Sequence, residues 1–270
     1  MDGVGPQPEG IGRDNRGLPV IRIKGFLETS FVDWPGRICA VLFLPYCNFR
    51  CPYCHNHDLV LEPEQYEDVP LDFALRRLGE LSGWVDGVCI TGGEPTIHPD
   101  LPSLIRDIKE RGMAVKLDTN GSHPDLLRKL MDEGLLDYVA MDVKAPLEEV
   151  SYRRAAGGAV NLERIKESIA LLMEGRVEYQ FRITVVPSLH KEGDLRRLAH
   201  QLQGARGLTL QNYNPQDPLD PSFREVRPYD DEWIKRMQQE VSRILQDGEK
   251  ARGKELPISS PLKRSRAQTG

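Results

Sequence analysis

Long apolar runs, a secretory signal and an excess of basic charge are all missing from this sequence. No apolar run approaches the roughly 20 residues that a membrane-spanning helix needs. Residues 1–16 combine Gly, Pro and charged residues without an apolar core, so they do not form a secretory signal. Lys and Arg number 36 against 41 Asp and Glu, for a net charge of -5, which gives no indication of nucleic-acid binding. These absences predict a cytoplasmic protein with no membrane partner and no nucleic-acid partner.

Cysteine is also scarce, and its distribution excludes a disulfide framework. The chain has 5 cysteines, an odd number, and most of them lie in one short segment. The other two, Cys39 and Cys89, lie within the apolar runs R-I-C-A-V-L-F-L and G-V-C-I-T. We expect both to be buried and to act as small hydrophobic residues. The sequence has no further cysteine cluster, so a second site built on clustered cysteines is excluded.

The cysteine triplet consists of Cys47, Cys51 and Cys54, in the segment C-N-F-R-C-P-Y-C. Three thiolates this close in sequence can hold a soft metal centre. They are one ligand short of the four that close a structural zinc site or an iron–sulfur cube, so a cluster bound here keeps one iron without a protein ligand. A Cys3His zinc site that uses His55 or His57 is the alternative. Structural zinc sites usually pair two ligand couples across a longer loop, and the sequence has no second couple.

The C-x3-C-x-aromatic-C spacing, with Tyr53 at the aromatic position, resembles the radical S-adenosylmethionine (SAM) superfamily. The resemblance implies that the cysteine triplet binds three irons of a [4Fe–4S] cluster. It also implies that the fourth iron chelates the amino and carboxylate groups of SAM, and that the reduced cluster cleaves SAM to a 5′-deoxyadenosyl radical. The resemblance therefore assigns a catalytic, metal-binding role to the triplet and a cofactor-binding role to Tyr53.

Apolar segments of two kinds alternate along the 270 residues and predict an α/β fold. Short β-branched runs, several of them apolar throughout, are typical of strands covered on both faces; they occupy residues 20–27, 37–44, 87–91, 113–118, 138–143, 179–186 and 208–212. Segments with apolar residues three and four apart predict helices; they occupy residues 72–81, 101–111, 124–133, 162–174 and 192–202, with a final helix at 228–246.

Six strand–helix units after an initial hairpin predict a parallel sheet with right-handed crossovers. The pattern alone fits either a partial barrel or an open doubly wound sheet. The resemblance implies a partial (β/α)6 TIM-type barrel with a short N-terminal strand extension, in which the chemistry lies beyond the C-terminal ends of the strands. We expect a flexible N-terminal tail at residues 1–18, the radical SAM domain at 19–247 and a disordered, basic C-terminal tail at 248–270.

The motif T-G-G-E-P, at residues 91–95, ends the predicted strand at 87–91. Its two glycines permit close backbone approach, although a plain strand-to-helix turn would also use them. The superfamily has a G-G-E-P motif at this place that contacts the amino group of SAM. The resemblance thus implies cofactor binding by Gly92, Gly93 and Glu94, and Gly93→Val is expected to block SAM binding while sparing the fold.

Charged residues lie at the ends of the next two predicted strands and within the strand that follows them. Asp118 lies in L-D-T-N-G, which resembles the D-T-N-G of glycyl radical enzyme activases, where the acid lies near SAM; an Asn-Gly turn could also simply reverse the chain. Asp142 and Lys144 resemble the D-x-K of the same activases, although a structural ion pair would also explain them. Arg182 lies among β-branched residues and needs a charged partner or a place at the barrel mouth. By resemblance, it faces the carboxylate or ribose of SAM.

The last predicted strand ends in Q-N-Y-N-P, where Asn212 and Asn214 could reach the adenosine of SAM. Formate-lyase-type activases tend to have a histidine at the position of Asn214, so the chain departs from their pattern there. The remaining histidines have no mutual spacing that suggests a metal site. We expect them in loops or on the surface; they are His98, His123, His190 and His200.

The segment at residues 25–56 narrows the resemblance. Ser30, the D-W-P-G turn that begins at Asp33 and the C-H-N after the triplet resemble glycyl radical enzyme activases. The D-W-P-G turn most resembles the activating proteins of anaerobic ribonucleoside-triphosphate reductase. The resemblance implies that reduced flavodoxin or ferredoxin gives one electron to the cluster. It also implies that the deoxyadenosyl radical removes a hydrogen atom from the α-carbon of a glycine in a partner enzyme.

Two other functions stay open on the sequence. A small-molecule radical SAM reaction, like that of 7-carboxy-7-deazaguanine synthase, would differ in the source of the hydrogen recovered in 5′-deoxyadenosine. A zinc-binding or electron-transfer module would differ in metal content, because a cubane cluster carries about four irons and four sulfides and a structural zinc site holds one zinc.

Overall fold

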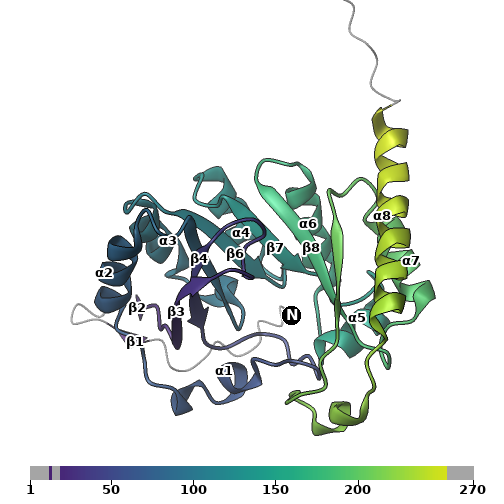
Figure 1. Ribbon diagram of the computed structural model, residues 1–270, viewed down its shortest axis with the longest axis horizontal. Coiled ribbons are helices and arrows are strands. Elements are labelled where there is room, and N and C mark those ends of the chain that lie inside the picture. Colours follow the sequence, from purple (N-terminus) through teal and green to yellow (C-terminus); the bar gives the residue numbers. More distant parts are fainter. Residues whose placement is uncertain (1–11, 14–18, 254–270) are drawn as a thin grey trace, which may run out of the picture.

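A computed structural model describes residues 12–13 and 19–253, with side-chain surroundings for residues 21–247. Its main sheet has the strand order β3-β4-β5-β6-β7-β8-β9 (Figure 1). The antiparallel pair β3–β4 starts the sheet, and each later neighbour is parallel. The predicted α/β partial barrel is confirmed. The strands are β3 (Gly25–Ser30), β4 (Cys39–Leu44), β5 (Gly87–Gly92), β6 (Ala114–Thr119), β7 (Tyr138–Asp142), β8 (Glu178–Val185) and β9 (Leu208–Asn212).

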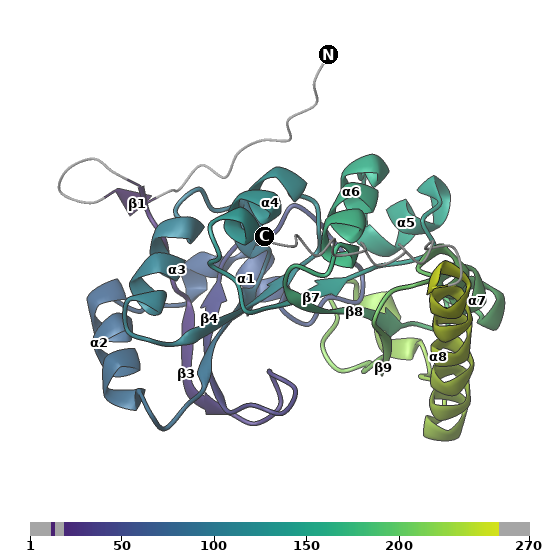
Figure 2. The same ribbon diagram turned by 90° about the horizontal axis from the view of Figure 1, so that it is seen from above.

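Helices connect the parallel strands and cover the outer face of the sheet (Figure 2). In α3, Leu104, Ile105 and Ile108 recur at helical spacing and are buried against the strands, and Pro102 lies in the first turn, where it costs no hydrogen bond. Helices α4 and α6 bury an apolar face in the same way. The helices are α1 (His57–Leu61), α2 (Leu71–Leu81), α3 (Leu101–Lys109), α4 (Pro124–Asp132), α5 (Glu149–Ala156), α6 (Leu162–Met173), α7 (Glu192–Gln201) and α8 (Asp231–Gly253).

The structure differs from the sequence prediction mainly at the edges. The strand predicted at 20–27 is split into β2 (Pro19–Val20), which pairs with β1 (Gly12–Arg13), and β3, which begins at Gly25. Two short helices, α1 and α5, were not predicted. Helix α8 continues to Gly253, past the domain boundary expected at residue 247. Residues 1–11, 14–18 and 254–270, which hold most of the two expected tails, lie outside the described residues, so the domain limits stay predictions.

The β3–β4 loop lies on the side of the sheet opposite α3, α4 and α6 (Figure 2). Its Trp34 is buried in a small cluster with Cys39, Val41 and Cys89. A Cβ at Gly87 would lie 2.8 Å from the Trp34 ring, so this strand position requires glycine. The expected burial of Cys39 and Cys89 is confirmed. Trp34 closes the interior of the barrel near the N-terminal ends of β4 and β5.

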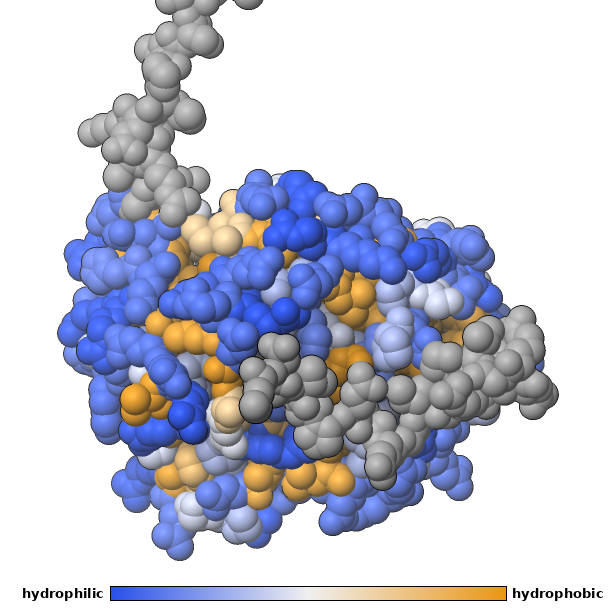
Figure 3. All heavy atoms as spheres, turned by 180° about the vertical axis from the view of Figure 1, so that it is seen from behind, coloured by the Kyte–Doolittle hydropathy of each residue, from blue (hydrophilic) through white to orange (hydrophobic). Residues whose placement is uncertain are grey.

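The face seen in Figure 3 is largely hydrophilic, with apolar side chains in separate small patches. Among the described helices, none is long and apolar enough to span a membrane.

Candidate active site

A cavity of about 500 Å³ opens at the C-terminal ends of the parallel strands and extends into the barrel to Asp33. It gathers residues that are far apart in the sequence, because the carboxyl ends of parallel strands meet at one edge of a sheet. All the predicted site residues except Asn214 line it: Cys47, Cys51, Tyr53, Cys54, Gly92, Gly93, Glu94, Asp118, Lys144 and Arg182.

The cluster loop, residues 45–56, follows β4 and carries the cysteine triplet. The N–H of Cys54 donates to the carbonyl oxygen of Cys51 at 3.0 Å, which forms a tight turn between these cysteines. The N–H of Arg50 donates to the carbonyl oxygen of Ala156, at the end of α5, at 2.9 Å. The Arg50 side chain folds back and donates to the carbonyl oxygen of Cys47. The loop is therefore held both by its own turns and by α5.

Glu94 joins the turns after β5 and β6. Its side chain is almost fully buried. One carboxylate oxygen accepts hydrogen bonds from the N–H and hydroxyl of Thr96 and from the Thr119 hydroxyl, and the other accepts from the Asn120 N–H at 2.6 Å. Burial raises the pKa of Glu94, although these donors favour the carboxylate. Glu94 lines the cavity and also fixes its wall. Its predicted contact with the SAM amino group stays a prediction.

A chain of alternating charges crosses the cavity. Arg182 on β8 reaches Asp142 on β7 (Nε to Oδ1, 2.9 Å) and Asp118 on β6 (Nη2 to Oδ2, 3.2 Å). Lys144 pairs with Asp142 at 3.3 Å, and Lys116 pairs with Asp118. Burial would raise the pKa of Asp142, but Arg182 and Lys144 outweigh it and hold this pKa at about 2. The carboxylates of Asp33 and Glu94 also line the cavity, so Arg182 and Lys144 are the cationic side chains there that an anionic ligand group would meet.

Lys116 is the member of this chain that the sequence analysis missed. Its side chain is 1% exposed, and Nζ also lies 3.5 Å from the Cys89 sulfur. A signal was present in A-V-K-L-D-T: Lys116 and Asp118 are two residues apart on one strand and must therefore face the same side. A charge in such a buried run needs a partner, and Asp118 supplies it.

Residues 41–202 match the radical SAM superfamily model, a span that begins in β4 and ends just beyond α7. The chain belongs to the radical SAM superfamily. It is therefore an enzyme, and its cofactors are a [4Fe–4S] cluster and SAM.

Relatives of this radical SAM protein include activating enzymes. It is 32% identical over 216 residues to MJ1227 of Methanocaldococcus jannaschii, a protein named provisionally as a glycyl-radical enzyme activating enzyme. The aligned region covers 76% of this chain and 85% of MJ1227. It is 24% identical over 249 residues to the pyruvate formate-lyase-activating enzyme of Clostridium pasteurianum, covering 83% of this chain and 98% of that protein. Streptococcus suis SuiB bound to SAM shares the fold, with a TM-score of 0.57 and 16% identity over 77% of this chain; the match spans 49% of the SuiB chain.

The described residues fit a cluster better than a single metal ion. A tetrahedral zinc site with Zn–S bonds of about 2.3 Å places its sulfurs about 3.8 Å apart. Among the described residues, no group of three potential ligands that includes a cysteine lies within 4.8 Å. His55 Nε2 instead bonds to the Asn214 carbonyl oxygen at 2.7 Å, and His57 pairs with Asp58 and Asp217. Neither histidine completes a zinc site with the cysteine triplet, which disfavours the zinc alternative.

In the absence of a metal, the triplet thiols are not suited to free thiolate chemistry. Burial raises the pKa of Cys47 to about 12 and that of Cys51 to about 11. Free thiols with these pKa values stay protonated near neutral pH, and metal binding replaces their protons. The Tyr53 hydroxyl is buried beside the triplet and has no hydrogen-bond partner among the described residues, so a polar group of a bound cofactor could satisfy it.

Two predictions about polar residues need correction or refinement. Asn214 does not line the cavity; its side-chain oxygen accepts a hydrogen bond from the Gln216 N–H at 3.0 Å, so its predicted contact with SAM gains no geometric support. Asn212 donates to the Tyr229 carbonyl oxygen at 2.6 Å.

Two of the remaining histidines are engaged in the interior. His190 lies in a loop, as expected, but it is fully buried. His98 Nε2 bonds to the Pro45 carbonyl oxygen at 2.8 Å.

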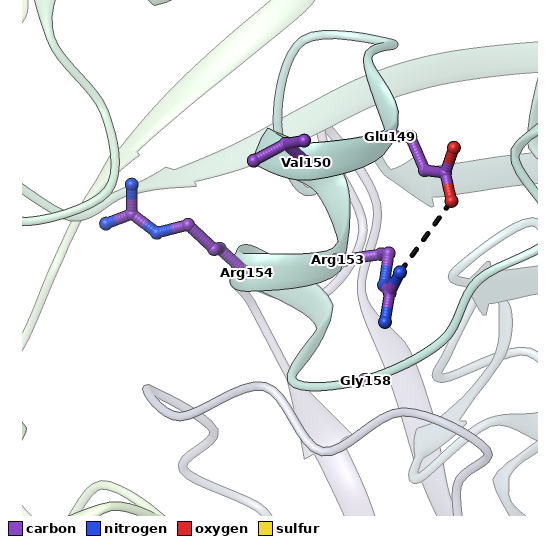
Figure 4. A pocket seen from close by; sticks show the side chains of 5 residues that line it. All are labelled: Glu149, Val150, Arg153, Arg154 and Gly158. Atoms are coloured by element: carbon purple, nitrogen blue, oxygen red, sulfur yellow. Dashed lines mark ion pairs between the residues drawn. The ribbon is translucent and has the colours of Figure 1, made fainter.

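A second hollow lies outside this site, on the surface of α5 (Figure 4). Its side chains point away from one another, except for Glu149 and Arg153, which pair at 3.7 Å. It contains none of the predicted site residues, and no chemistry is assigned to it.

Gly157→Ala is expected to displace the cluster loop. Gly157 has a φ of +74°, and a Cβ there would lie 1.7 Å from the Arg50 carbonyl oxygen. We expect a loss of about 1–3 kcal/mol in the free energy of unfolding and reduced iron retention after anaerobic reconstitution. Gly158→Ala is the matched control, because a Cβ at Gly158 meets nothing within 4 Å. Equal iron content and thermal stability in the two variants would contradict this role for the contact.

Proposed function

We propose that this protein is an activating enzyme that generates a glycyl radical on a partner enzyme. The observation that carries the proposal is the similarity to MJ1227, which extends over 76% of this chain and 85% of MJ1227. The similarity to a pyruvate formate-lyase-activating enzyme supports the same function. We further propose anaerobic ribonucleoside-triphosphate reductase as the partner, on the D-W-P-G turn, and flavodoxin or ferredoxin as the reductant in the cytoplasm.

When bound, the cluster and SAM supply one-electron reductive cleavage of a sulfonium, which yields methionine and a deoxyadenosyl radical able to take a hydrogen atom from carbon. The residues that line the cavity have proposed roles in binding the cluster and SAM. Cys47, Cys51 and Cys54 hold the cluster, and Gly92 and Gly93 let the β5 turn approach SAM closely. Arg182 and Lys144, the two cations that line the cavity, attract the SAM carboxylate.

The partner's glycine must reach the cavity from outside the barrel. Strands β3 and β9 are the two ends of the sheet and do not pair with each other, so strand pairing does not close the barrel. A protein loop could enter through this side. Abstraction from glycine leaves 5′-deoxyadenosine, with the removed hydrogen at its 5′ carbon, and a radical on the glycine α-carbon.

The test uses reconstituted protein, dithionite and SAM under anaerobic conditions, with an anaerobic reductase in which glycine is α-deuterated. We expect deuterium in 5′-deoxyadenosine and a glycyl radical in the electron paramagnetic resonance (EPR) spectrum of the reductase. The activase proposal would be overturned if 5′-deoxyadenosine formed without deuterium and the reductase showed no glycyl radical. Hydrogen taken up from an added small molecule would then indicate small-molecule chemistry. Transfer from a different glycyl radical enzyme alone would overturn only the reductase assignment.

Asp33→Ala is expected to lower glycyl radical formation more than it lowers SAM cleavage without the partner. Asp33 lines the cavity but comes from the β3–β4 loop rather than from the cluster loop. Its carboxylate accepts a hydrogen bond from the Ser30 hydroxyl. Asp33→Asn keeps an acceptor for Ser30 and removes the charge, so it separates loop shape from electrostatics. The glycyl radical and the 5′-deoxyadenosine formed without the partner are each quantified per iron. Equal losses of both products in Asp33→Ala would contradict a role in partner recognition.

A further inference from the structure

Lys144 reaches the cavity from a short segment that follows β7, and its main chain is anchored on both sides. The preceding residue, Val143, donates its N–H to the Arg182 carbonyl oxygen at 2.9 Å, which extends the β7–β8 pairing by one residue. The carbonyl oxygen of Lys144 faces His190 Nε2 at 2.8 Å. The position of the Lys144 ammonium, 3.3 Å from Asp142, therefore depends on a backbone held by β8 and by His190.

The protonation of His190 follows from its surroundings. The imidazole is fully buried, and the Val186 N–H, which can only donate, points at Nδ1 at 3.0 Å. Nδ1 must therefore accept, so the single ring proton is on Nε2 and is donated to the Lys144 carbonyl oxygen. Burial also lowers the pKa of His190 to about 4, which keeps the ring neutral near neutral pH. One tautomer satisfies both contacts.

The main chain of His190 is held as firmly as its ring. The His190 N–H donates to the Val186 carbonyl oxygen at 2.7 Å, and the Tyr229 hydroxyl donates to the His190 carbonyl oxygen at 2.9 Å. Asn212, at the end of β9, donates to the Tyr229 carbonyl oxygen. The link from Lys144 therefore runs through His190 to the segment between β9 and α8, and it joins the ends of three strands.

We propose that His190 is a positioning residue that places Lys144 for SAM binding; this rests on the proposed contact of Lys144 with the cofactor. His190 itself does not line the cavity, so it acts only through the Lys144 main chain. Without the imidazole, the Lys144 carbonyl loses its buried donor and must turn to find another. That turn moves the ammonium away from Asp142 and from an anionic group in the cavity.

The experiment measures the dissociation constant of SAM on the reconstituted protein with an oxidised cluster, so it does not depend on turnover. We compare His190→Leu, which removes both hydrogen bonds, with His190→Gln, whose amide can accept and donate. A displaced Lys144 ammonium loses one contact with the cofactor, and the loss of one such hydrogen bond corresponds to roughly tenfold in affinity. We therefore expect about tenfold weaker binding in His190→Leu and partial recovery in His190→Gln. Leu198→Ala, at a fully buried residue of α7, controls for loss of stability alone and should bind SAM as the wild type does.

Lys144→Met tests whether His190 acts through Lys144. In that background, His190→Leu should cost no further affinity, since the group that it positions is absent. Independent losses that multiply in the double variant would overturn the inference and indicate a general structural role. Unchanged affinity in His190→Leu, or in Lys144→Met, would overturn it as well. Wild-type protein that carries the cluster and binds no SAM would overturn the proposed function together with this inference, so the two failures are distinguishable.

Discussion

Cys51→Ala is expected to abolish SAM cleavage because it removes one of only three protein ligands to the cluster. Loss of a residue that merely supports a metal ligand typically costs 10–100-fold in metal affinity or activity, and loss of a ligand itself should cost more than that. Cys51 is a buried residue of the cluster loop and lines the cavity. His55 and His57 are both engaged elsewhere. Neither histidine is therefore placed to take over as ligand.

The measurement for Cys51→Ala is iron and sulfide per chain after anaerobic reconstitution, followed by chromatography of 5′-deoxyadenosine. Cys39→Ala provides a matched control. Cys39 is also fully buried, but it packs against Trp34, Val41 and Cys89 and does not line the cavity. The Cys39→Ala substitution should therefore lower the stability of the protein and leave the cluster intact. A Cys51→Ala variant that is iron-replete and active would contradict the assignment of the cysteine triplet.

The predicted site residues that line the cavity are brought together for one physical reason. Asp118, Lys144 and Arg182 each lie at or near the C-terminal end of a parallel strand, and such ends converge whatever the details of packing. Strong strand patterns, such as the run at 37–44, fix where those ends fall. The site could therefore be assembled from strand boundaries and motifs, before any side chain was placed.

The features of the structure that could not be predicted from the sequence depend on contacts between distant segments. Helix α5 has a weak apolar pattern, and it ends where Gly157 packs on the carbonyl of Arg50, about a hundred residues earlier in the chain. Asn214 turns away from the cavity while His55 bonds its carbonyl oxygen. The role of His190 depends on three elements that meet only in the fold. Local patterns do not contain such information, because the partner that decides each case is remote in sequence.

Sequence reasoning also misjudged Gly93. It predicted that a side chain at Gly93 would block SAM and spare the fold. A Cβ at Gly93 would instead lie 1.7 Å from the Tyr46 carbonyl oxygen, in the main chain that leads into the cysteine triplet. The neighbouring N–H of Glu94 donates to that same carbonyl at 2.8 Å. The β5 turn and the cluster loop therefore pack main chain against main chain, and a side chain at Gly93 must push them apart.

Gly93→Ala is accordingly expected to reduce both iron retention and SAM affinity, with SAM cleavage falling below detection. Backbone atoms cannot yield as a flexible side chain can, so even a methyl group should shift Tyr46 and the thiol that follows it, at a cost on the order of 1–3 kcal/mol in unfolding free energy. Gly207→Ala is the control, because a Cβ at Gly207 meets nothing within 4 Å. Iron per chain and the SAM dissociation constant are measured on both variants. A Gly93→Ala variant with wild-type iron content but weakened SAM binding would show that Gly93 only makes room for the ligand. Loss of both iron and SAM affinity would show that this glycine couples the β5 turn to the cluster loop.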